Sequence, residues 1–358
     1  MIHIALLPSV TDSQKVCTEA DKLRPVVRQF LVRKRVSRVS TTTHRQKNVI
    51  EPNRAIMVQA ILMTHDNRQL QKTVLVVGCS DSPVTSTVST VLSSWKLECA
   101  QDNEEALVLV AKSAFDLFIT DQGSSGREDV ELLQKVRSVS PLTRVIIVAD
   151  KSTPADVTAA IRARAFSYFT KPLSSQALEE VLQLAMDSPA CDEAIEMLSG
   201  TDAWIRLSVR CDVLTANRLQ QFVREFLNLP EADENKVATA SREMLLNAME
   251  HGGKFDPQRR IEIAYLRARH VVLIRIKDPG EGFSLQENLD TAANNPPDDP
   301  LRHLKHREAQ GMRPGGYGIL LAKNLVDELF YGEKGNDVLL IKYISDERRG
   351  SVSPPPRI

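Results

Sequence analysis

Two polar side chains that stand four residues apart could act on the same ligand. Glu243 and Asn247 lie in the segment ATASREMLLNAMEHGG, where a helical pattern places them on one face. A carboxylate and an amide oxygen suit magnesium, which prefers hard oxygen ligands and retains several waters. The same pair on a helix is more often solvated surface, so this spacing needs support from other parts of the chain.

A second signal is the turn DPGEGF, which directly follows the predicted strand VVLIRIK. A carboxylate at a strand end, here Asp278, can accept a hydrogen bond from the amino group of adenine. Gly280 and Gly282 permit tight backbone turns next to a ligand. Alone, such a segment is more often an ordinary glycine-rich turn.

A third signal is the segment RPGGYG, in which Gly315, Gly316 and Gly318 precede an apolar-periodic helix. Exposed N–H groups and the helix dipole at such a start can hold phosphates. A glycine-rich helix start is weak evidence by itself. The three signals are informative together because they occur in order, on a helix, a strand end and a helix start.

This ordered arrangement resembles the N, G1 and G2 boxes of the GHKL ATP-binding fold, and the compact spacing is similar to the anti-sigma-factor serine kinases. The resemblance implies ATP and Mg²⁺ as cofactors. It implies that Asn247 ligates the metal, that Glu243 is the general base toward a protein hydroxyl, and that Asp278 recognises adenine. The glycines that would shape the lid and the phosphate cradle are Gly280, Gly282, Gly316 and Gly318. His251 completes the first box or is structural.

One departure from that family concerns the phosphate cradle. Many members have Arg between the last two glycines, where this chain has Tyr317. Arg313 or Lys323 are candidates to compensate. The polar stretch 284–312 is predicted to form a mobile ATP lid. Its histidines could also suggest a metal site, but histidines in a charged, flexible lid are the commoner case.

The chain before this region carries a second pair of chemically interesting residues. Asp121 ends the buried strand FDLFITD, and Lys171 lies in FTKPL after a later strand. Five alternating strand and helix patterns surround them, and this pattern resembles the receiver domain of response regulators. The resemblance implies that Asp121 is the phosphoacceptor and Lys171 its partner.

The receiver resemblance is incomplete at two positions. The family places an acidic pair after the first strand, where this chain has Gly78 and Cys79, and a Ser or Thr where it has Ala149. Without the carboxylates that hold a cation, phosphoryl transfer to an aspartate lacks charge compensation. We therefore predict a vestigial site with a retained ion pair rather than a working phosphoacceptor.

The predicted elements give the fold class, an α/β protein in two parts. A doubly wound parallel (βα)5 domain alternates strands and helices from 73 to 187. An α/β sandwich follows, with strands at 203–210, within 260–278 and at 337–344, and helices at 213–228, 234–250 and 316–329. The predicted domains are a disordered or mis-annotated extension at 1–70, a receiver-like domain at 71–190, an ATP-binding kinase domain at 191–346 and a disordered tail at 347–358.

Composition limits the partners and the cellular compartment that we expect for this chain. The 358 residues carry 46 basic and 46 acidic side chains, and Met1 to Leu62 holds 11 of the basic and 4 of the acidic ones. The remaining residues are therefore acidic overall, which makes nucleic-acid binding by the main body improbable. The five cysteines are scattered, which favours a reducing cytoplasm over a disulfide framework or zinc site. No apolar run reaches the roughly 18 residues that a membrane span needs.

Taken together, these patterns predict a cytoplasmic ATP-dependent signalling regulator. The leading hypothesis is a serine/threonine kinase that acts on an anti-anti-sigma-type partner, with the receiver used for regulation or interaction. The alternative is a catalytically weak ATP-binding scaffold that sequesters a sigma factor or similar protein. A histidine kinase fits less well, because no room remains for a dimerisation hairpin with an acceptor histidine. A homodimer is compatible with either hypothesis.

Overall fold

The computed structural model describes residues 71–78, 82–188, 193–282 and 318–344. All of them belong to one compact unit. The expectations for the extension at 1–70, the tail at 347–358 and the lid at 284–312 fall outside the described residues, as does Gly316.

The first described region is a parallel five-stranded sheet with the strand order β2-β1-β3-β4-β5. Its strands are β1 (Thr73–Val77), β2 (Lys96–Ala100), β3 (Leu117–Thr120), β4 (Arg144–Ala149) and β5 (Ser167–Thr170). The central strands β1, β3 and β4 are almost wholly buried, as expected for a sheet covered on both faces.

Five helices cover this sheet, each with a side-chain N-cap. They are α3 (Pro83–Val91), α4 (Asn103–Lys112), α5 (Gly126–Val139), α6 (Pro154–Arg162) and α7 (Ser175–Asp187). The capping residues are Ser82, Asp102, Ser125, Thr153 and Ser174. Helices α3 and α7 pack with one face of the sheet, and α4, α5 and α6 pack with the other. The predicted doubly wound parallel domain is confirmed.

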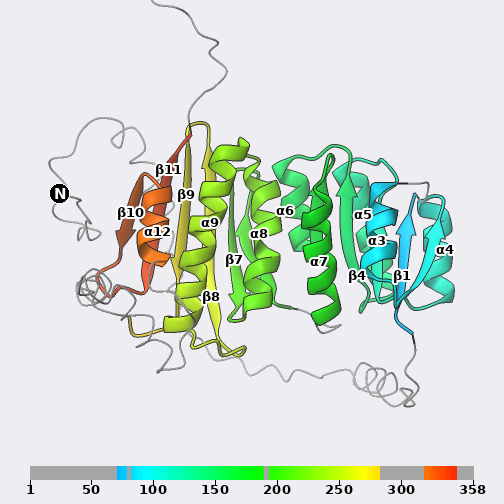
Figure 1. Cartoon of the computed structure of the whole chain (residues 1–358), viewed down its shortest axis with the longest axis horizontal. Coiled ribbons are helices and arrows are strands. Elements are labelled where there is room, and N and C mark those ends of the chain that lie inside the picture. Colours follow the sequence, from blue (N-terminus) through cyan, green and yellow to red (C-terminus); the bar gives the residue numbers. More distant parts are fainter. Residues whose placement is uncertain (1–70, 79–81, 189–192, 283–317, 345–358) are drawn as a thin grey trace, which may run out of the picture. The chain divides into compact units, whose positions relative to one another are not determined.

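The second region is a six-stranded antiparallel sheet with the order β10-β11-β9-β8-β7-β6. Its strands are β6 (Ile195–Gly200), β7 (Trp204–Arg210), β8 (Arg260–Ala268), β9 (Val271–Lys277), β10 (Glu328–Tyr331) and β11 (Asp337–Tyr343). The helices α8 (Val213–Leu227), α9 (Glu231–Asn247) and α12 (Gly318–Leu325) lie on one face of it (Figure 1). This arrangement confirms the predicted α/β sandwich.

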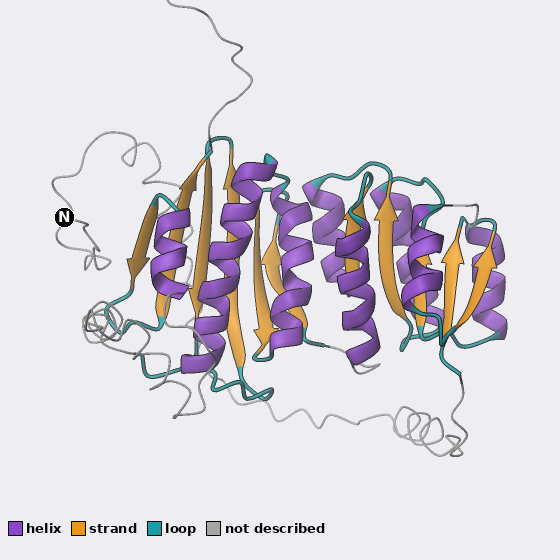
Figure 2. Cartoon of the chain, viewed as in Figure 1, coloured by secondary structure: helices purple, strands orange, loops and turns teal. Residues whose placement is uncertain are grey.

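The core of this sandwich follows from strand alternation. Every second residue of β7, including Leu207 and Val209, is buried in the same cluster as Phe222 and Phe226 of α8. In Figure 2, helices and strands form separate layers here, so one face of the sheet carries the helices that position the candidate site.

Two strands were not anticipated from the sequence. The predicted helix at 316–329 ends at Leu325, and residues 328–331 form β10 instead. The side chain of Asp327 accepts a hydrogen bond from the backbone N–H of Tyr343, which ties the chain to β11 at the point where the helix stops. The other strand, β6, is a short edge strand with a register shift between Met197 and Ser199, so its alternation is hard to read.

The segment between α7 and β7 bears on the histidine kinase hypothesis. Its described residues form β6, which pairs antiparallel with β7. Within the described part of that segment there is no helical hairpin of the kind a histidine phosphoacceptor domain requires.

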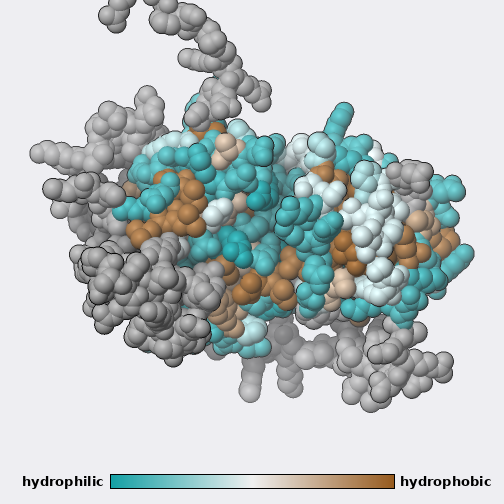
Figure 3. All heavy atoms as spheres, in the orientation of Figure 1, coloured by the Kyte–Doolittle hydropathy of each residue, from teal (hydrophilic) through white to brown (hydrophobic). Residues whose placement is uncertain are grey.

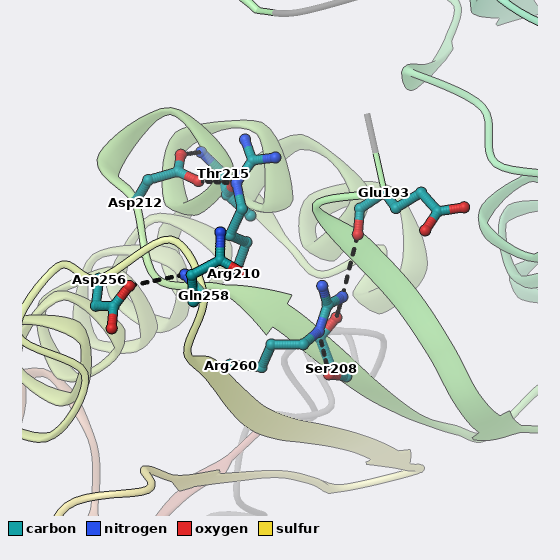
Figure 4. A network of polar contacts seen from close by, with 8 residues as sticks. All are labelled: Glu193, Ser208, Arg210, Asp212, Thr215, Asp256, Gln258 and Arg260. Atoms are coloured by element: carbon teal, nitrogen blue, oxygen red, sulfur yellow. Dashed lines mark hydrogen bonds and ion pairs between the residues drawn. The ribbon is translucent and has the colours of Figure 1, made fainter. Parts of the chain in front are cut away.

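Polar contacts fix the ends of the sandwich strands (Figure 4). The guanidinium of Arg260 donates to the hydroxyl of Ser208 at 2.7 Å and to the carbonyl of Glu193 at 3.1 Å. Asp212 caps α8 by accepting from the N–H of Thr215 at 2.7 Å. These contacts hold the start of β8 against β7 and set the direction of α8.

Helix α8 also contacts the edge strand β5 of the first sheet. Arg218 is buried and donates to the carbonyl of Phe166 at 2.8 Å, and Gln221 donates to the carbonyl of Tyr168 at 3.1 Å. A carboxylate oxygen of Glu225 accepts from the hydroxyl of Thr170 at 2.7 Å. Side chains of α8 therefore satisfy backbone groups that an edge strand would otherwise leave unpaired.

The cysteines depart in part from expectation. Cys211 is a free, buried thiol, whereas Cys99 on β2 is disulfide-bonded. Scattered spacing in the sequence does not exclude such a pair, because folding brings distant positions together. Among the described helices, none is long and apolar enough to span a membrane.

Candidate functional site

Helix α9 positions the first two candidate residues. Its apolar side, which includes Val237 and Met244, is buried in the core. Glu243 and Asn247 lie one turn apart near the C-terminal end of the helix, on a shared face. The helix thus presents a carboxylate and an amide side by side, as the spacing predicts.

The start of α12 meets both side chains. A Cβ atom placed on Gly318 would lie 3.0 Å from Oε2 of Glu243 and 3.2 Å from Nδ2 of Asn247. Helix α12 approaches α9 this closely because residue 318 has no side chain. The first and third sequence signals therefore come together in space through Glu243, Asn247 and Gly318.

The residues that follow α9 contact Asp278, the aspartate of the turn DPGEGF. It continues into a single π-helical turn, Ala248–Gly252. A Cβ atom on Gly252 would overlap the carboxylate of Asp278. Single π turns often occur at functional sites, and this one places the end of the first motif against the aspartate of the second.

Asp278 is held by backbone contacts at the end of β9. Its Oδ1 accepts a hydrogen bond from the N–H of Gly280 at 2.8 Å. Burial raises the pKa of the Asp278 carboxyl above its ordinary value, and the hydrogen bond from Gly280 offsets part of that shift. A half-buried carboxylate in a fixed orientation can accept a hydrogen bond from a ligand amino group.

Residues in the turn between β10 and β11 hydrogen-bond to the glycine-rich turn at 278–282. Nδ2 of Asn336 donates to the carbonyl of Gly280 at 2.9 Å, and the backbone N–H of Asp278 donates to the carbonyl of Asn336 at 3.1 Å. Gly282 has a φ of 93°, and a Cβ atom there would overlap the carbonyl oxygen of Lys334. A glycine is therefore required at 282 for both conformation and space.

Other predicted residues lie outside the described residues or at other positions on α12 and the π turn. Gly316, Arg313 and Tyr317 lie outside the described residues. Lys323 belongs to the last turn of α12, whereas Gly318 is at the helix start. His251 lies exposed on the π turn.

Sequence reasoning missed several residues around the site. Gly252 was visible in NAMEHGG, but its contact with Asp278 depends on the π turn, which no spacing rule predicts. Asn336 stands before the predicted strand at 337–344, and only strand pairing brings it to Gly280. Arg242 and Asn217, which contact each other beside Glu243, carried no sequence signal.

The chemical character of these groups fits a nucleotide with magnesium. Glu243 and Asn247 supply hard oxygens, and the position of Gly318 has no side chain between them and the start of a helix. Within the described ranges no three His, Cys, Asp or Glu side chains form a metal cluster. Magnesium commonly binds through one or two protein ligands, and phosphate oxygens of the nucleotide and waters complete its coordination. A single asparagine can therefore be sufficient as the protein ligand.

The candidate phosphoacceptor site in the first sheet, at Asp121 and Lys171, contains an ion pair. Lys171 lies 2.9 Å from Oδ1 of Asp121 and 2.9 Å from Oδ1 of Asp150, which follows β4. Burial lowers the pKa of Lys171, but hydrogen bonds to Asp121 and Asp150 outweigh it and raise that pKa above its ordinary value. Asp150 was not singled out in the sequence. The lysine is therefore shared between two carboxylates.

The backbone at the end of β1 leaves no room for an acidic side chain at residue 78. Gly78 has a φ of 86°, and a Cβ atom there would lie 2.7 Å from the carbonyl oxygen of Asp121. Nearby, the buried carboxyl of Asp129 accepts from the hydroxyl of Ser124 at 2.6 Å, and burial raises its pKa to about 6. The backbone of Asp121 is thus packed against glycine.

Comparisons with known proteins agree with a division of the chain into two domains. Residues 58–183 match the family model of the response regulator receiver domain, and residues 211–342 match that of the histidine kinase-like ATPase domain. The transcriptional regulatory protein GlrR of Escherichia coli K12 is 29% identical over 96 residues, which are 26% of this chain and 22% of that protein. The chain thus spans only about a fifth of the length of this relative.

Solved receiver structures also match the chain. A CheY-like receiver from Methanospirillum hungatei is 20% identical, with a TM-score of 0.27, covering 33% of this chain and 94% of that one. CheY4 of Vibrio cholerae is 26% identical, with a TM-score of 0.28, covering 32% and 97%. The family matches and the two observed sheets together show that this chain carries a response regulator receiver domain followed by a histidine kinase-like ATPase domain of the GHKL superfamily.

Proposed function

We propose that the ATPase domain is a protein kinase that transfers the γ-phosphoryl group of ATP to a serine or threonine of an anti-anti-sigma-type protein. The observation that supports this most strongly is the meeting of Glu243, Asn247 and Gly318. A carboxylate that lies beside a magnesium ligand and a helix start is placed to receive a proton near bound phosphate.

Each residue has a defined role in this proposal. Asn247 would hold magnesium, which neutralises charge on the phosphate oxygens. Asp278 accepts from the adenine amino group, while Gly280, Gly282, Gly316 and Gly318 shape the backbone around the nucleotide. The acceptor hydroxyl oxygen forms a bond to the γ-phosphorus, the bond from that phosphorus to its bridging oxygen breaks, and ADP departs. Glu243 takes the hydroxyl proton.

The surface near the site fits a protein acceptor. Figure 3 shows hydrophobic surface over α12, and Leu321 on that helix is 42% exposed. An exposed apolar side chain on the helix that begins at the candidate phosphate site can contact a partner that brings its hydroxyl to Glu243.

The receiver domain serves regulation or protein interaction in this account. A receiver joined to a kinase-like ATPase domain is the architecture of a signalling regulator, and GlrR is a transcriptional regulatory protein. The boundaries that we propose are 71–190 for the receiver and 191–346 for the kinase domain. A cytoplasmic location and a homodimer are part of the same proposal.

A second candidate function is an ATP-binding scaffold that sequesters a sigma-like factor without transferring phosphate. The observation that favours it is the receiver edge, where Lys171 is already shared by Asp121 and Asp150. A vestigial receiver site, as we propose for Asp121, is consistent with a chain that binds nucleotide without transferring phosphate. Nucleotide-dependent capture of the partner with no phosphate transfer supports this function over the first.

Phosphate transfer from ATP tests the proposal directly. The full chain is incubated with Mg²⁺, γ-labelled ATP and a purified anti-anti-sigma-type domain, and phosphoserine or phosphothreonine is measured. Glu243→Gln should bind the nucleotide normally but reduce transfer by about 100-fold or more. Equal transfer by Glu243→Gln, or no transfer by the wild type, contradicts the catalytic claim.

A further inference from the structure

Arg242 precedes the candidate base and is held by a neighbouring helix. Its Nε and Nη2 donate to Oδ1 of Asn217 on α8, at 3.2 Å and 3.0 Å. Its Nη1 lies 3.6 Å from Oε1 of Glu243. The side chain of Arg242 is 38% exposed and that of Glu243 is 19% exposed.

This contact departs from ordinary helix geometry. Consecutive residues of an α-helix point in different directions and do not normally face each other. Asn217 explains the exception, because its amide oxygen engages one edge of the guanidinium and leaves Nη1 on the side of Glu243. The rigid planar fork of arginine makes such a fixed orientation possible.

The two oxygens of Glu243 consequently have different surroundings. Oε1 is the atom near Arg242, at 3.6 Å. Oε2 is the atom near the start of α12, where it would lie 3.0 Å from a Cβ on Gly318. A carboxylate fixed through one oxygen presents the other in a defined direction, which is what a general base requires.

We propose that Arg242 is a positioning residue for Glu243 and that Asn217 is its anchor. This inference rests on the proposed kinase function and deepens it. Arg242 acts on the orientation of the carboxylate and contacts neither adenine nor metal in this account. Exposed ion pairs contribute little to stability, so its loss affects the rate of phosphate transfer more than folding.

The chain offers a matched control for this proposal. Arg224 on α8 contacts Glu234 on α9 at 2.5 Å, and its side chain is also 38% exposed. It links the same two helices away from Glu243. A purely structural role for Arg242 would make Arg242→Ala and Arg224→Ala behave alike.

The test compares Arg242→Ala, Asn217→Ala and Arg224→Ala in the full chain. Transfer from Mg²⁺-ATP to a purified anti-anti-sigma-type domain gives kcat and KM, and titration with a fluorescent ATP analogue gives nucleotide affinity. We expect kcat to fall about 30-fold in Arg242→Ala and about 10-fold in Asn217→Ala. We expect nucleotide affinity to change less than about twofold, and Arg224→Ala to transfer at nearly the wild-type rate.

A second readout does not depend on turnover. Melting temperatures of Arg242→Ala, Asn217→Ala and the double variant are measured without nucleotide, and non-additive shifts show that the two side chains interact in solution. If the wild type transfers phosphate and kcat is unchanged in Arg242→Ala, this inference is overturned while the proposed function stands. Additive shifts in melting temperature overturn it in the same way. Absence of transfer by the wild type overturns the proposed function and this inference with it.

Discussion

The two candidate sites of this chain differ in how their carboxylates are compensated. At the receiver edge, Asp121 and Asp150 share Lys171, and Gly78 packs against the backbone of Asp121. In the ATPase domain, Asp278 and Glu243 face positions where glycines leave space, at Gly252 and Gly318. At the first site one lysine serves two carboxylates, whereas at the second site the carboxylates of Asp278 and Glu243 lie directly beside glycine backbone. This difference supports our proposal that ligand chemistry belongs to the second site.

The largest effect should come from removing one aspartate in each region. Asp278→Ala should weaken ATP binding by about 100-fold or more, because a group that accepts from the ligand is lost. Asp121→Ala should leave ATP affinity within about twofold of the wild type, since its partners are in the receiver. Isothermal titration with Mg²⁺-ATP measures both, and equal losses in the two variants would contradict the comparison.

A smaller effect is expected from filling the space at Gly252. Gly252→Ala places a methyl group on the carboxylate of Asp278, which must move. We expect about tenfold weaker nucleotide binding and a lower melting temperature. Gly332→Ala is the matched control, because its added Cβ would meet the side chain of Asp337 at 3.2 Å. Similar binding by both variants would show that the contact of Gly252 is unimportant.

The contact between α8 and β5 predicts a pH-dependent stability. Burial raises the pKa of Glu225 to about 7, although hydrogen bonds from Thr170 lower it in part. The folded state therefore binds more protons than the unfolded state between about pH 4.5 and about pH 7, and stability falls as pH rises through this range.

Glu225→Gln removes this titration and keeps an acceptor for Thr170. The stability of the variant relative to the wild type should rise by about 2 kcal/mol from pH 5 to pH 8. Urea unfolding at several pH values measures the difference. The same pH dependence in both proteins would show that Glu225 does not titrate in this way.

The smallest expected effect concerns phosphorylation of the receiver. Because Lys171 is shared and residue 78 is a glycine, acetyl phosphate with Mg²⁺ should leave Asp121 unmodified. Intact-mass measurement detects one added phosphoryl group. A stoichiometric mass increase that disappears in Asp121→Asn would show that the receiver edge still does phosphoryl chemistry and would erase the contrast with the ATPase site.

Periodicity and motif order in the sequence predicted both domains, because the apolar patterns of the strands and helices are strong. They also placed Glu243, Asn247, Asp278 and Gly318 on the correct kinds of element. The contacts of Gly252, Asn336 and Arg242 could not be predicted, since they depend on a π turn, on strand pairing and on helix packing between distant segments. The misread end of the helix at Leu325 has the same origin: Val326, Leu329 and Tyr331 fit the apolar pattern of a continuing helix, and only pairing with β11 makes residues 328–331 a strand.

The central claim is that three separated motifs form one site for magnesium-bound adenine nucleotide. Titration of the full chain with a fluorescent ATP analogue, with and without Mg²⁺, tests it most directly when Asn247→Ala is measured in parallel. We predict saturable binding by the wild type that weakens about 10-fold or more when Mg²⁺ is removed or Asn247 is replaced. Wild-type protein that does not bind the nucleotide, or that binds it equally well under all these conditions, would contradict the account.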